Sequence, residues 1–334
     1  MISLICWLYL AFISSWLTLY FLIGEKFVFI AMLDYLAVYL FLPLPLVLLA
    51  ALACRNRRLG AGFIIGGFAF IWFWGVLFFP RPSPPQPGGP TLSVMTYNVL
   101  AWHTHTAPVL NTIRAEDPDI VLLQELNLTL ARALEEQLGE VYPYQVLNPV
   151  DDPRGIGVIS KFPIQATGEL LPEEWVGGPQ VLELSWNGER ITLVNYHMYP
   201  TTGIRPLSRV ERSVQLREAE ARQLADLARR SGIAIMGGDA NCTSLSPAYR
   251  ILTGALSDSY REAGFGLGHT FPGSDIPESD RPHFGGWYVP QWLARIDYVF
   301  HSAEWEVVTA RVARFDGVSD HRGVVAVLRL AAGE

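Results

Sequence analysis

IAIMGGDAN (residues 233–241) is an apolar run that ends in two glycines followed by Asp239 and Asn241. A short apolar run bounded by turn-forming residues predicts a buried β-strand, with the polar side chains placed at its end. Asp and Asn are also common turn residues, so this stretch alone favours a structural role for both of them. It gains weight because the same pattern occurs elsewhere in the chain.

Other segments repeat the arrangement of an apolar run beside polar side chains. They are TYNVL, DIVLLQEL, ITLVNYHMY, RIDYVF and SDHRGV, and they carry Asn98, Glu125, His197, Asp297, Asp320 and His321. Carboxylates are ligands for a hard divalent cation, and imidazoles can transfer protons or stabilise charge that develops on a phosphoryl group. Strand ends on a rigid scaffold can aim such groups at one cavity. The set therefore predicts metal-assisted attack on a phosphate, whereas each residue alone would more often be structural.

In this order the motifs resemble those of the endonuclease/exonuclease/phosphatase superfamily, which includes deoxyribonuclease I-like nucleases, neutral sphingomyelinases and inositol-polyphosphate 5-phosphatases. The resemblance extends over about residues 92–330. It implies an α/β fold, a four-layer α-β-β-α sandwich of two packed sheets flanked by helices. It also implies a phosphodiesterase or phosphatase that uses Mg²⁺, with Mn²⁺ as the alternative ion. Helical periodicity over residues 107–116, 129–138 and 210–230 agrees with this architecture.

The resemblance assigns metal binding to Asn98, Glu125 and Asp320. In the family, the match to Glu125 holds the ion, the match to Asn98 assists it, and the match to Asp320 is often near the metal. His103 and His105, in AWHTHT, have a spacing that would suit a second metal. We favour a loop with exposed imidazoles for this pair, because two histidines after a strand do not by themselves make a metal site.

The remaining residues are implied to act in catalysis. Asp239 would orient or deprotonate the attacking water, and Asn241 would hold a phosphate oxygen. His321 would act as general base or stabilise the transition state, while His197 would donate to the phosphoryl oxygens or to the leaving group. Asp297 would fix the tautomer and orientation of one of these histidines, a role that imidazole catalysis commonly needs. The sequence leaves open which histidine that is.

Residues 1–80 have a different composition. Three apolar runs are each long enough to cross a hydrocarbon core of ~30 Å as a helix, and they occupy residues 2–23, 35–54 and 60–79. We therefore predict three transmembrane helices. A cleaved signal peptide is the alternative for the first, but that run lacks a basic start and continues beyond the length of a normal apolar core of a signal peptide. Pro43 and Pro45 should bend or shorten the second helix, which leaves a two-span arrangement open.

Charge and proline content indicate how the rest of the chain is attached. The basic cluster RNRR, residues 55–58, lies between the second and third apolar runs. The positive-inside rule places this cluster in the cytoplasm, so the catalytic domain, residues 91–334, is predicted to be extracytoplasmic in a multi-pass protein of the cell membrane. RPSPPQPGGP, residues 81–90, predicts a stiff polyproline II linker. Such a tether would keep the domain near the lipid bilayer and present a lipid substrate at high effective concentration.

The charge balance bears on the substrate class. Of 25 basic and 32 acidic residues, 21 and 30 lie after residue 80, a net charge of −9. This charge disfavours a polyanion such as nucleic acid. Arg205, Arg209 and Arg212 could still form a basic strip or a phosphate clamp, and a solvated helix face is an equal alternative. Cys242 is the only cysteine after residue 80, so this domain has no internal disulfide.

PHFGGWYVPQWLAR (residues 282–295) is an aromatic segment, rich in Gly and Pro, that directly precedes the Asp297 motif. Its aromatic residues are Phe284, Trp287, Tyr288 and Trp292. Such side chains can lie at a headgroup interface or hold an apolar chain, and they can equally fold back onto the core. His269, in GHTF, is expected beside the site, because the family has a Thr-aromatic strand there.

Together these patterns predict a membrane-anchored, divalent-metal-dependent hydrolase of phosphoric esters that acts on a lipid or lipid-linked phosphate at the outer face of the membrane. The layout resembles bacterial members of the superfamily with three N-terminal helices, some tied to teicoplanin-type glycopeptide resistance, which makes an undecaprenyl-linked phosphate a candidate. An extracytoplasmic nuclease is the first alternative. A catalytically silent, membrane-tethered binding protein is the second, and the intact Glu125, Asp239 and His321 argue against it. The oligomeric state is left open.

Overall fold

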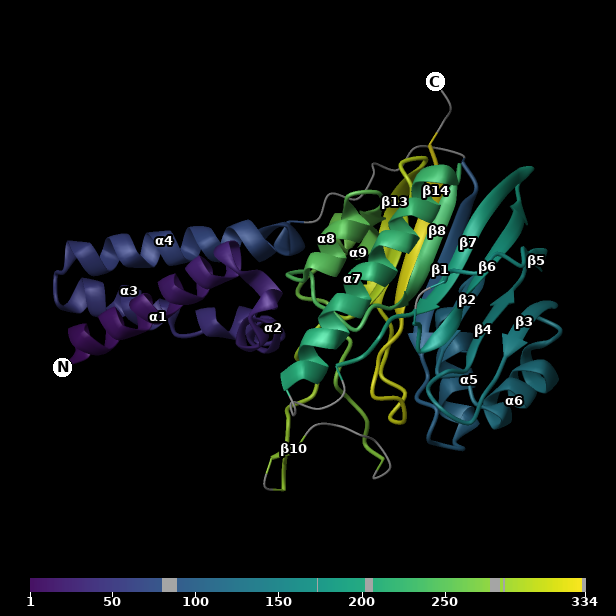
Figure 1. Cartoon of the computed structure of the whole chain (residues 1–334), viewed down its shortest axis with the longest axis horizontal. Coiled ribbons are helices and arrows are strands. Elements are labelled where there is room, and N and C mark those ends of the chain that lie inside the picture. Colours follow the sequence, from purple (N-terminus) through teal and green to yellow (C-terminus); the bar gives the residue numbers. More distant parts are fainter. Residues whose placement is uncertain (80–88, 173, 202–206, 277–282, 285, 332–334) are drawn as a thin grey trace.

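Two six-stranded mixed sheets, packed face to face, form the centre of the C-terminal domain (Figure 1). They belong to a computed structural model that describes residues 1–79, 89–172, 174–201, 207–276, 283–284 and 286–331. The predicted proline-rich linker, residues 81–90, lies almost entirely outside the described residues, as does Arg205.

The two sheets contain twelve of the strands. The first has the order β13 (Trp305–Val312), β14 (Val324–Leu330), β1 (Thr91–Asn98), β2 (Ile120–Gln124), β4 (Ile156–Ser160) and β3 (Tyr144–Asn148). The second has the order β5 (Ile164–Ala166), β6 (Gly177–Trp186), β7 (Glu189–His197), β8 (Ala234–Asp239), β12 (Asp297–His301) and β9 (Ser257–Asp258). β1 and β2 are parallel, as are β7 and β8, so each sheet has neighbouring strands that end at the same edge.

Helices cover the outer faces of both sheets (Figure 1). α5 (Thr106–Glu116) and α6 (Leu128–Leu138) pack on the first sheet, and α7 (Leu207–Arg230) and α8 (Pro247–Thr253) pack on the second. The short α9 (Ser259–Ala263) contacts β12 and β13. The predicted α-β-β-α sandwich is confirmed, and the three predicted helices are observed to within three residues at each end.

The strand β2 shows why apolar runs in this chain form strands covered on both sides. All of its residues are buried: Val121 and Leu123 face α5 and α6, whereas Leu122 packs in the core between the sheets. Alternate side chains of a strand point to opposite faces, so a strand covered on both faces is a continuous apolar run. The glycines of β8 allow the close packing, because a Cβ on Gly237 would lie 2.6 Å from Leu122 Cδ1.

Two N-terminal helices are long and apolar enough to cross a membrane, judged by length and composition. They are α1 (Ile2–Leu22) and α4 (Arg57–Trp74), which continues into the 3-10 turn η3 (Gly75–Phe78). The predicted second span, residues 35–54, is not one α-helix: it begins at the C-cap of α2 (Val28–Asp34) and continues through the 3-10 turn η2 (Ala37–Phe41) and α3 (Leu44–Ala53). Residues 28–34 and 37–53 meet at 78°, so this middle run, now residues 28–53, makes a third span only if both parts are counted together.

The break in the middle run lies at Tyr35 and Leu36, ahead of the two prolines. Pro43 is the N-cap of α3 and Pro45 lies in its first turn, where a missing N–H costs no helical hydrogen bond. The prolines therefore start a new helix, whereas the bend that was expected at them lies earlier, at Tyr35 and Leu36.

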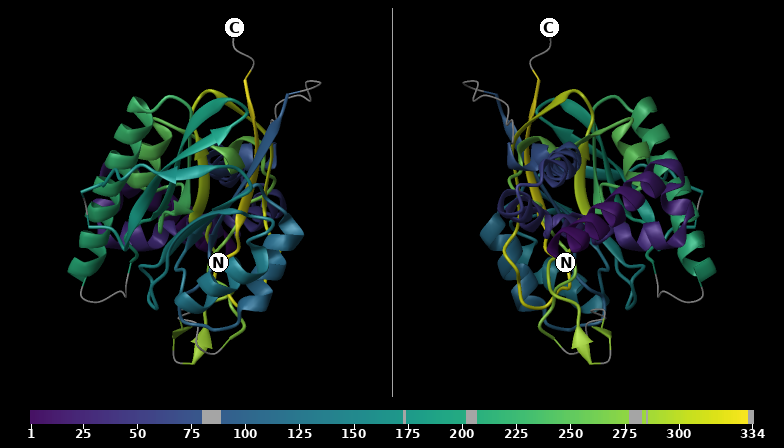
Figure 2. Two further views of the ribbon diagram at one scale, coloured as in Figure 1. Left: turned by 90° about the vertical axis from the view of Figure 1, so that its right-hand side faces the viewer. Right: turned by 90° about the vertical axis from the view of Figure 1, so that its left-hand side faces the viewer.

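The N-terminal helices project from one side of the sandwich as a bundle, with α2 at the junction between the two parts (Figure 1). Figure 2 shows this bundle end-on against the sheets. The N-terminus and the turn between α3 and α4 lie at the end of the bundle that is remote from the domain. That turn and the start of α4 carry the exposed Arg55, Arg57 and Arg58.

A buried ion pair holds β12 to the segment that contains β9 and α9. Arg295 donates through two nitrogens to Asp258, at 3.0 and 2.7 Å, and both side chains are almost fully buried. Burial acts to raise the pKa of Asp258, but the charge and hydrogen bonds of Arg295 outweigh it and hold that pKa below its ordinary value. Asp258 also caps α9 by accepting from the N–H groups of Tyr260 and Arg261.

Replacing Arg295 by Met should lower the free energy of unfolding by ~3–5 kcal/mol, because the Asp258 carboxylate would stay buried without its partner. Arg229→Met is the matched control: it removes an exposed partner of Asp226 on α7 and should change stability by less than ~1 kcal/mol. Denaturation of the detergent-solubilised protein, followed by circular dichroism, compares the two. Similar losses of unfolding free energy in both variants would contradict the larger contribution expected from the buried ion pair.

Candidate active site

All eight predicted site residues lie at one edge of the two sheets: Asn98, Glu125, His197, Asp239, Asn241, Asp297, Asp320 and His321. The parallel strands β1 and β2, and β7 and β8, end at this edge. β14 and β12 run antiparallel to β1 and β8, so they begin there. In register, Asp239 pairs with His197 on one side and with Asp297 on the other. The topology thus gathers strand ends that are far apart in the sequence.

Asn98 joins carboxylates from the two sheets. Its Nδ2 donates to Glu125 Oε1 at 3.0 Å and to Asp239 Oδ2 at 3.1 Å. Its Oδ1 accepts from the N–H of Leu100 at 3.1 Å. The other oxygen of Glu125 accepts from the N–H of Ala101 at 3.1 Å. Asn98 therefore orients the carboxylates through its nitrogen here, whereas the resemblance implies that it assists the metal directly.

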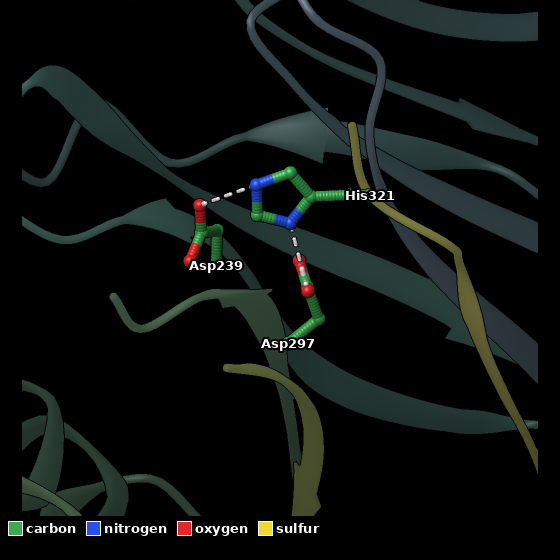
Figure 3. Close-up of side chains that lie close together, drawn as sticks. All are labelled: Asp239, Asp297 and His321. Carbon is green, nitrogen blue, oxygen red and sulfur yellow. Dashed lines mark hydrogen bonds and ion pairs between the residues drawn. The ribbon is translucent and has the colours of Figure 1, made fainter. Parts of the chain in front are cut away.

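His321 lies between two aspartates (Figure 3). Its Nδ1 is 2.9 Å from Asp297 Oδ2, and its Nε2 is 3.7 Å from Asp239 Oδ2. Burial favours the neutral imidazole, but the carboxylates of Asp297 and Asp239 outweigh it and raise the pKa of His321 well above its ordinary value. The histidine that Asp297 contacts, which the sequence left open, is His321.

His197 and Asn241 flank Asp239 on its other sides. His197 Nε2 is 3.5 Å from Asp239 Oδ2, and its Nδ1 is 3.2 Å from the carbonyl oxygen of Pro153. Asn241 has a left-handed backbone φ of 48°, a conformation that Asn adopts more readily than most residues. Its N–H donates to Asp239 Oδ1 at 2.8 Å, and its Nδ2 donates to the carbonyl oxygen of Met198 at 2.9 Å.

The site holds an excess of buried negative charge. Burial, together with the nearby Asp297, raises the pKa of Asp239. Burial raises the pKa of Asp320 to about 7, with further contributions from Glu125 and Asp239. One oxygen of Asp320 and one of Asp297 have no hydrogen-bond partner. Unpartnered carboxylate oxygens in a buried acidic cluster are the donors that a hard divalent cation binds.

Among the described residues, one set of ligand atoms is close enough to hold such an ion. Asp239, Asp297 and His321 have ligand atoms within 4.8 Å of one another, but the hydrogen bond to Asp297 already occupies one ring nitrogen of His321. Glu125 and Asp320 both line the cavity at this edge and offer oxygen donors. The residues present therefore fit a divalent metal.

The cluster opens into a cavity of about 430 Å³. Six of the site residues line it: Glu125, His197, Asp239, Asn241, Asp320 and His321. Apolar side chains line much of the remaining wall, including Leu100, Val210, Phe271 and Val289. A further part of the wall comes from the N-terminal region, where α2 and the break supply Ala31, Met32, Tyr35 and Leu36. The catalytic cluster and the apolar N-terminal segment thus share one cavity.

Three residues of the cavity wall were not predicted from the sequence. The hydroxyl of Tyr35 donates to the carbonyl oxygen of Asn241 at 2.6 Å. Arg217, on α7, is only 2% exposed. The ring of Phe271 lies 4.9 Å from that of His321. Phe271 is the last residue of the GHTF motif, so the sequence did contain a signal that could have indicated it. Tyr35 stands in an apolar run and Arg217 in an ordinary amphipathic pattern, and neither pattern indicates a place in the cavity wall.

Three histidines of the sequence analysis lie outside the cluster. The prediction of exposed imidazoles is wrong for His103, which is buried because its loop folds back: its Nε2 is 2.6 Å from the carbonyl oxygen of Val99. His105 is exposed and donates its N–H to His103. His269, expected beside the site, does not line the catalytic cavity, and its Nδ1 is 2.8 Å from the carbonyl oxygen of Trp292. Burial lowers the pKa of His269 to about 4.

The arginines proposed as a basic strip do not line the cavity in the described part of the chain. Arg209 is exposed on α7. Arg212 forms an exposed ion pair with Glu174 at 2.7 Å. A solvated helix face, the alternative interpretation, therefore describes these two residues.

The aromatic segment divides into two parts. Trp287 and Tyr288 are 83% and 56% exposed in a short hairpin of β10 (His283–Phe284) and β11 (Trp287–Tyr288), which projects below the sandwich in Figure 1. Trp292 instead packs against the domain, with Arg322 4.2 Å above its ring and the ring of Phe315 4.8 Å away. Trp287 and Tyr288 are thus exposed side chains of the hairpin, whereas Trp292 is part of the packing.

Solved structures share the fold of this chain. An endonuclease/exonuclease/phosphatase family protein from Bacteroides thetaiotaomicron is 20% identical, with a TM-score of 0.52. The match covers 73% of this chain and 100% of that protein. A second, from Bacteroides vulgatus, is 18% identical, with a TM-score of 0.53 over 72% and 100%. D. rerio TDP2, complexed with a single-strand DNA product, is 16% identical, with a TM-score of 0.53 over 72% and 99%. At these identities the likeness shows the fold alone.

The sequence comparison identifies the family directly. No curated protein matches the sequence. A profile of the Endonuclease/Exonuclease/phosphatase family matches residues 95–321, which is more than half of the chain. This range contains all eight site residues, from Asn98 to His321, and the chain belongs to the endonuclease/exonuclease/phosphatase family.

Proposed function

We propose that this protein is a membrane-anchored, divalent-metal-dependent hydrolase that acts on a lipid or lipid-linked phosphate at the outer face of the membrane. Hydrolysis of phosphoric esters follows from the family. One observation supports the lipid substrate: the cavity that holds the carboxylates and histidines is walled in part by apolar side chains of the N-terminal segment. A phosphate with an apolar chain fits a cavity with a polar end and an apolar wall.

In this proposal Glu125 and Asp320 hold a divalent cation, Mg²⁺ or Mn²⁺. Asn98 orients Glu125 by donating a hydrogen bond to its Oε1. When bound, the ion supplies Lewis-acid stabilisation of the negative charge on the phosphoryl oxygens. Without it, the buried carboxylates would repel an anionic substrate.

The other site residues act on the water and on the phosphoryl group. Asp239 accepts hydrogen bonds from Asn98 and Asn241, which leaves it placed to orient the attacking water and take its proton. His321, held by Asp297, presents Nε2 toward Asp239. Because the raised pKa of His321 favours the protonated imidazole, the role of transition-state stabiliser fits it better than that of general base. His197 donates to a phosphoryl oxygen or the leaving group. Asn241 uses its side-chain N–H groups, one of which is bonded to the carbonyl oxygen of Met198, to hold a phosphate oxygen.

A nuclease remains the alternative within the same chemistry, since the fold is shared with a protein solved with a DNA product. Two features favour a lipid phosphate over DNA. The chain after residue 80 has a net charge of −9, and Arg212 is already paired with Glu174. A silent binding protein is disfavoured by the intact cluster around Asp239.

The outward orientation of the domain is supported by the layout of the bundle. The basic turn between α3 and α4 lies at the end remote from the domain, on the same side as the N-terminus (Figure 1). If the positive-inside rule holds for Arg55, Arg57 and Arg58, this end is cytoplasmic and the domain lies outside.

Removal of the metal or of its main ligand should abolish turnover. Glu125→Ala should lower kcat for a soluble diester, bis(p-nitrophenyl) phosphate, by ~10²-fold or more, because the charge of the transition state would lose its stabiliser. Glu135→Ala, which removes an exposed carboxylate on α6, serves as the control and should be active. EDTA should inactivate the unmodified protein, and Mg²⁺ or Mn²⁺ should restore it. Full activity in EDTA would exclude the metal role.

The apolar wall should set the preference for lipid. Leu36→Trp fills the wall and should raise KM for a lipid phosphate in vesicles by ~10-fold, with KM for the soluble diester unchanged, because only binding to the apolar chain is impaired. Leu42→Trp is the control, since Leu42 is exposed and outside the cavity. If the unmodified protein turns over plasmid DNA and no lipid phosphate, the nuclease alternative is correct.

Native cysteines can report the orientation. Cys54, next to the basic turn, is exposed, whereas Cys6 and Cys242 are buried. A membrane-impermeant maleimide added to intact spheroplasts should leave Cys54 unlabelled, and permeabilised membranes should label it. Cys54→Ser identifies the labelled site. Labelling of Cys54 in intact spheroplasts would reverse the proposed topology.

A further inference from the structure

Two tyrosines of the N-terminal region reach the edges of the active site. Tyr35 stands at the break between α2 and η2, and its hydroxyl donates to the carbonyl oxygen of Asn241 at 2.6 Å. Tyr39 lies in η2, one helical turn later. Its hydroxyl is 3.1 Å from His269 Nδ1 and 3.3 Å from the carbonyl oxygen of Trp292.

The bond from Tyr35 holds a peptide that carries a site residue. Asn241 has a left-handed φ of 48°, and its N–H donates to Asp239 Oδ1. The backbone N–H of Asn241 is therefore held by Asp239, and the backbone carbonyl of Asn241 is held by Tyr35. With both ends of the residue held, its backbone is restrained, and the bond from its Nδ2 to the carbonyl oxygen of Met198 then orients the side chain at the cavity.

Tyr39 acts on the segment that supports His321 from the opposite side. This segment, residues 269–273, is bonded to both neighbours of His321: Arg322 donates its N–H to the carbonyl oxygen of Thr270 at 3.0 Å, and Gly273 donates to the carbonyl oxygen of Asp320 at 2.7 Å. Phe271, in the middle of the segment, packs against the His321 ring. Anchoring the segment through Tyr39 thus restrains the backbone on both sides of His321.

The two bonds belong to a wider contact between the N-terminal region and the domain. Ala31 packs against Val210 and Val214 of α7. Glu25 accepts a hydrogen bond from the hydroxyl of Ser246 at 3.2 Å. The tyrosines therefore act from a docked element, and their hydroxyls are held in place against the domain.

We propose that Tyr35 and Tyr39 are positioning residues for catalysis, so that the N-terminal segment is a working part of the active site as well as an anchor. Tyr35 orients Asn241, and Tyr39 restrains the loop of Asp320 and His321. The inference requires only the hydrolysis of phosphoric esters and holds whether the substrate is a lipid or a soluble ester. Small displacements of catalytic groups are costly, since a misplacement of about 1 Å can lower the rate by ~10²-fold.

The test uses the full chain in nanodiscs and the soluble bis(p-nitrophenyl) phosphate, which needs no contact with the apolar wall. The Tyr35→Phe/Tyr39→Phe double variant should lower kcat by ~10-fold or more, with KM within about twofold, because the site groups are misaligned but substrate binding is retained. The matched control is Tyr20→Phe. It removes a hydroxyl at the same contact, one that donates to the carbonyl oxygen of Leu245 at 3.1 Å, away from the cavity. The control should keep the unmodified kcat.

Hydrogen exchange gives a second readout that does not depend on turnover. In the double variant, amides of residues 239–244 and 269–273 should exchange faster, while the Tyr20→Phe control should leave both segments unchanged. Unaltered exchange in the double variant, or a fall in kcat that Tyr20→Phe reproduces, would overturn the positioning role. If the unmodified protein hydrolysed no phosphoric ester, the proposed function would fail, and the exchange measurement would still decide whether the tyrosines hold these loops.

Discussion

The repulsion between carboxylates buried at one edge of the sheets is the constraint on which the rest of the site depends. Charges that lie a few ångströms apart, away from water, interact strongly, and burial alone already disfavours the ionised form. The protein offsets part of this cost with its own groups: His321 faces Asp297 and Asp239, and Asn98 donates to Asp239 and Glu125. Asp320 keeps an unpartnered oxygen and a raised pKa. The charge that remains uncompensated lies in a group of side chains that could hold a divalent cation, which agrees with the proposed metal dependence.

Much of the fold and the main cluster could be predicted because their signals are local in the sequence. An apolar run such as the one before Asp239 specifies a buried strand, and a polar residue at its end then lies at the edge of a sheet. Local patterns cannot show that Glu125 and His321, which are far apart in the sequence, meet in one cavity. The order of the motifs, which resembles that of the family, supplied this prediction. The two prolines gave a similar local signal, since Pro43 and Pro45 start α3 as their chemistry requires.

The rest could not be predicted because it depends on how distant segments dock. Tyr35 occupies an apolar run in which nothing distinguishes it from a residue that faces lipid, and only the placement of α2 against the domain brings its hydroxyl to Asn241. Arg217 was part of an amphipathic helix, and its burial depends on the loop of Tyr199 and Thr201, whose oxygens it contacts at 3.1 and 2.9 Å. His103 was expected in solvent, in a loop that follows a strand. Its ring is buried by a loop that bends back onto β1.

The break in the middle apolar run connects these observations. A straight helix satisfies its own backbone groups, whereas a break in a membrane segment frees some of them and is tolerated where protein covers it. Here the break lies against the domain, and its ends carry the tyrosines that bond to the domain. An unbroken helix through Tyr35 and Leu36 would continue along the axis of α2, and Tyr39 would then not lie beside His269. The irregular geometry therefore has a physical reason: the bend of 78° allows one short segment to line the cavity and to contact loops on both sides of the catalytic cluster. A flexible tether alone would require no such bend, which is why the contact between the two parts is better understood as part of the enzyme than as attachment alone.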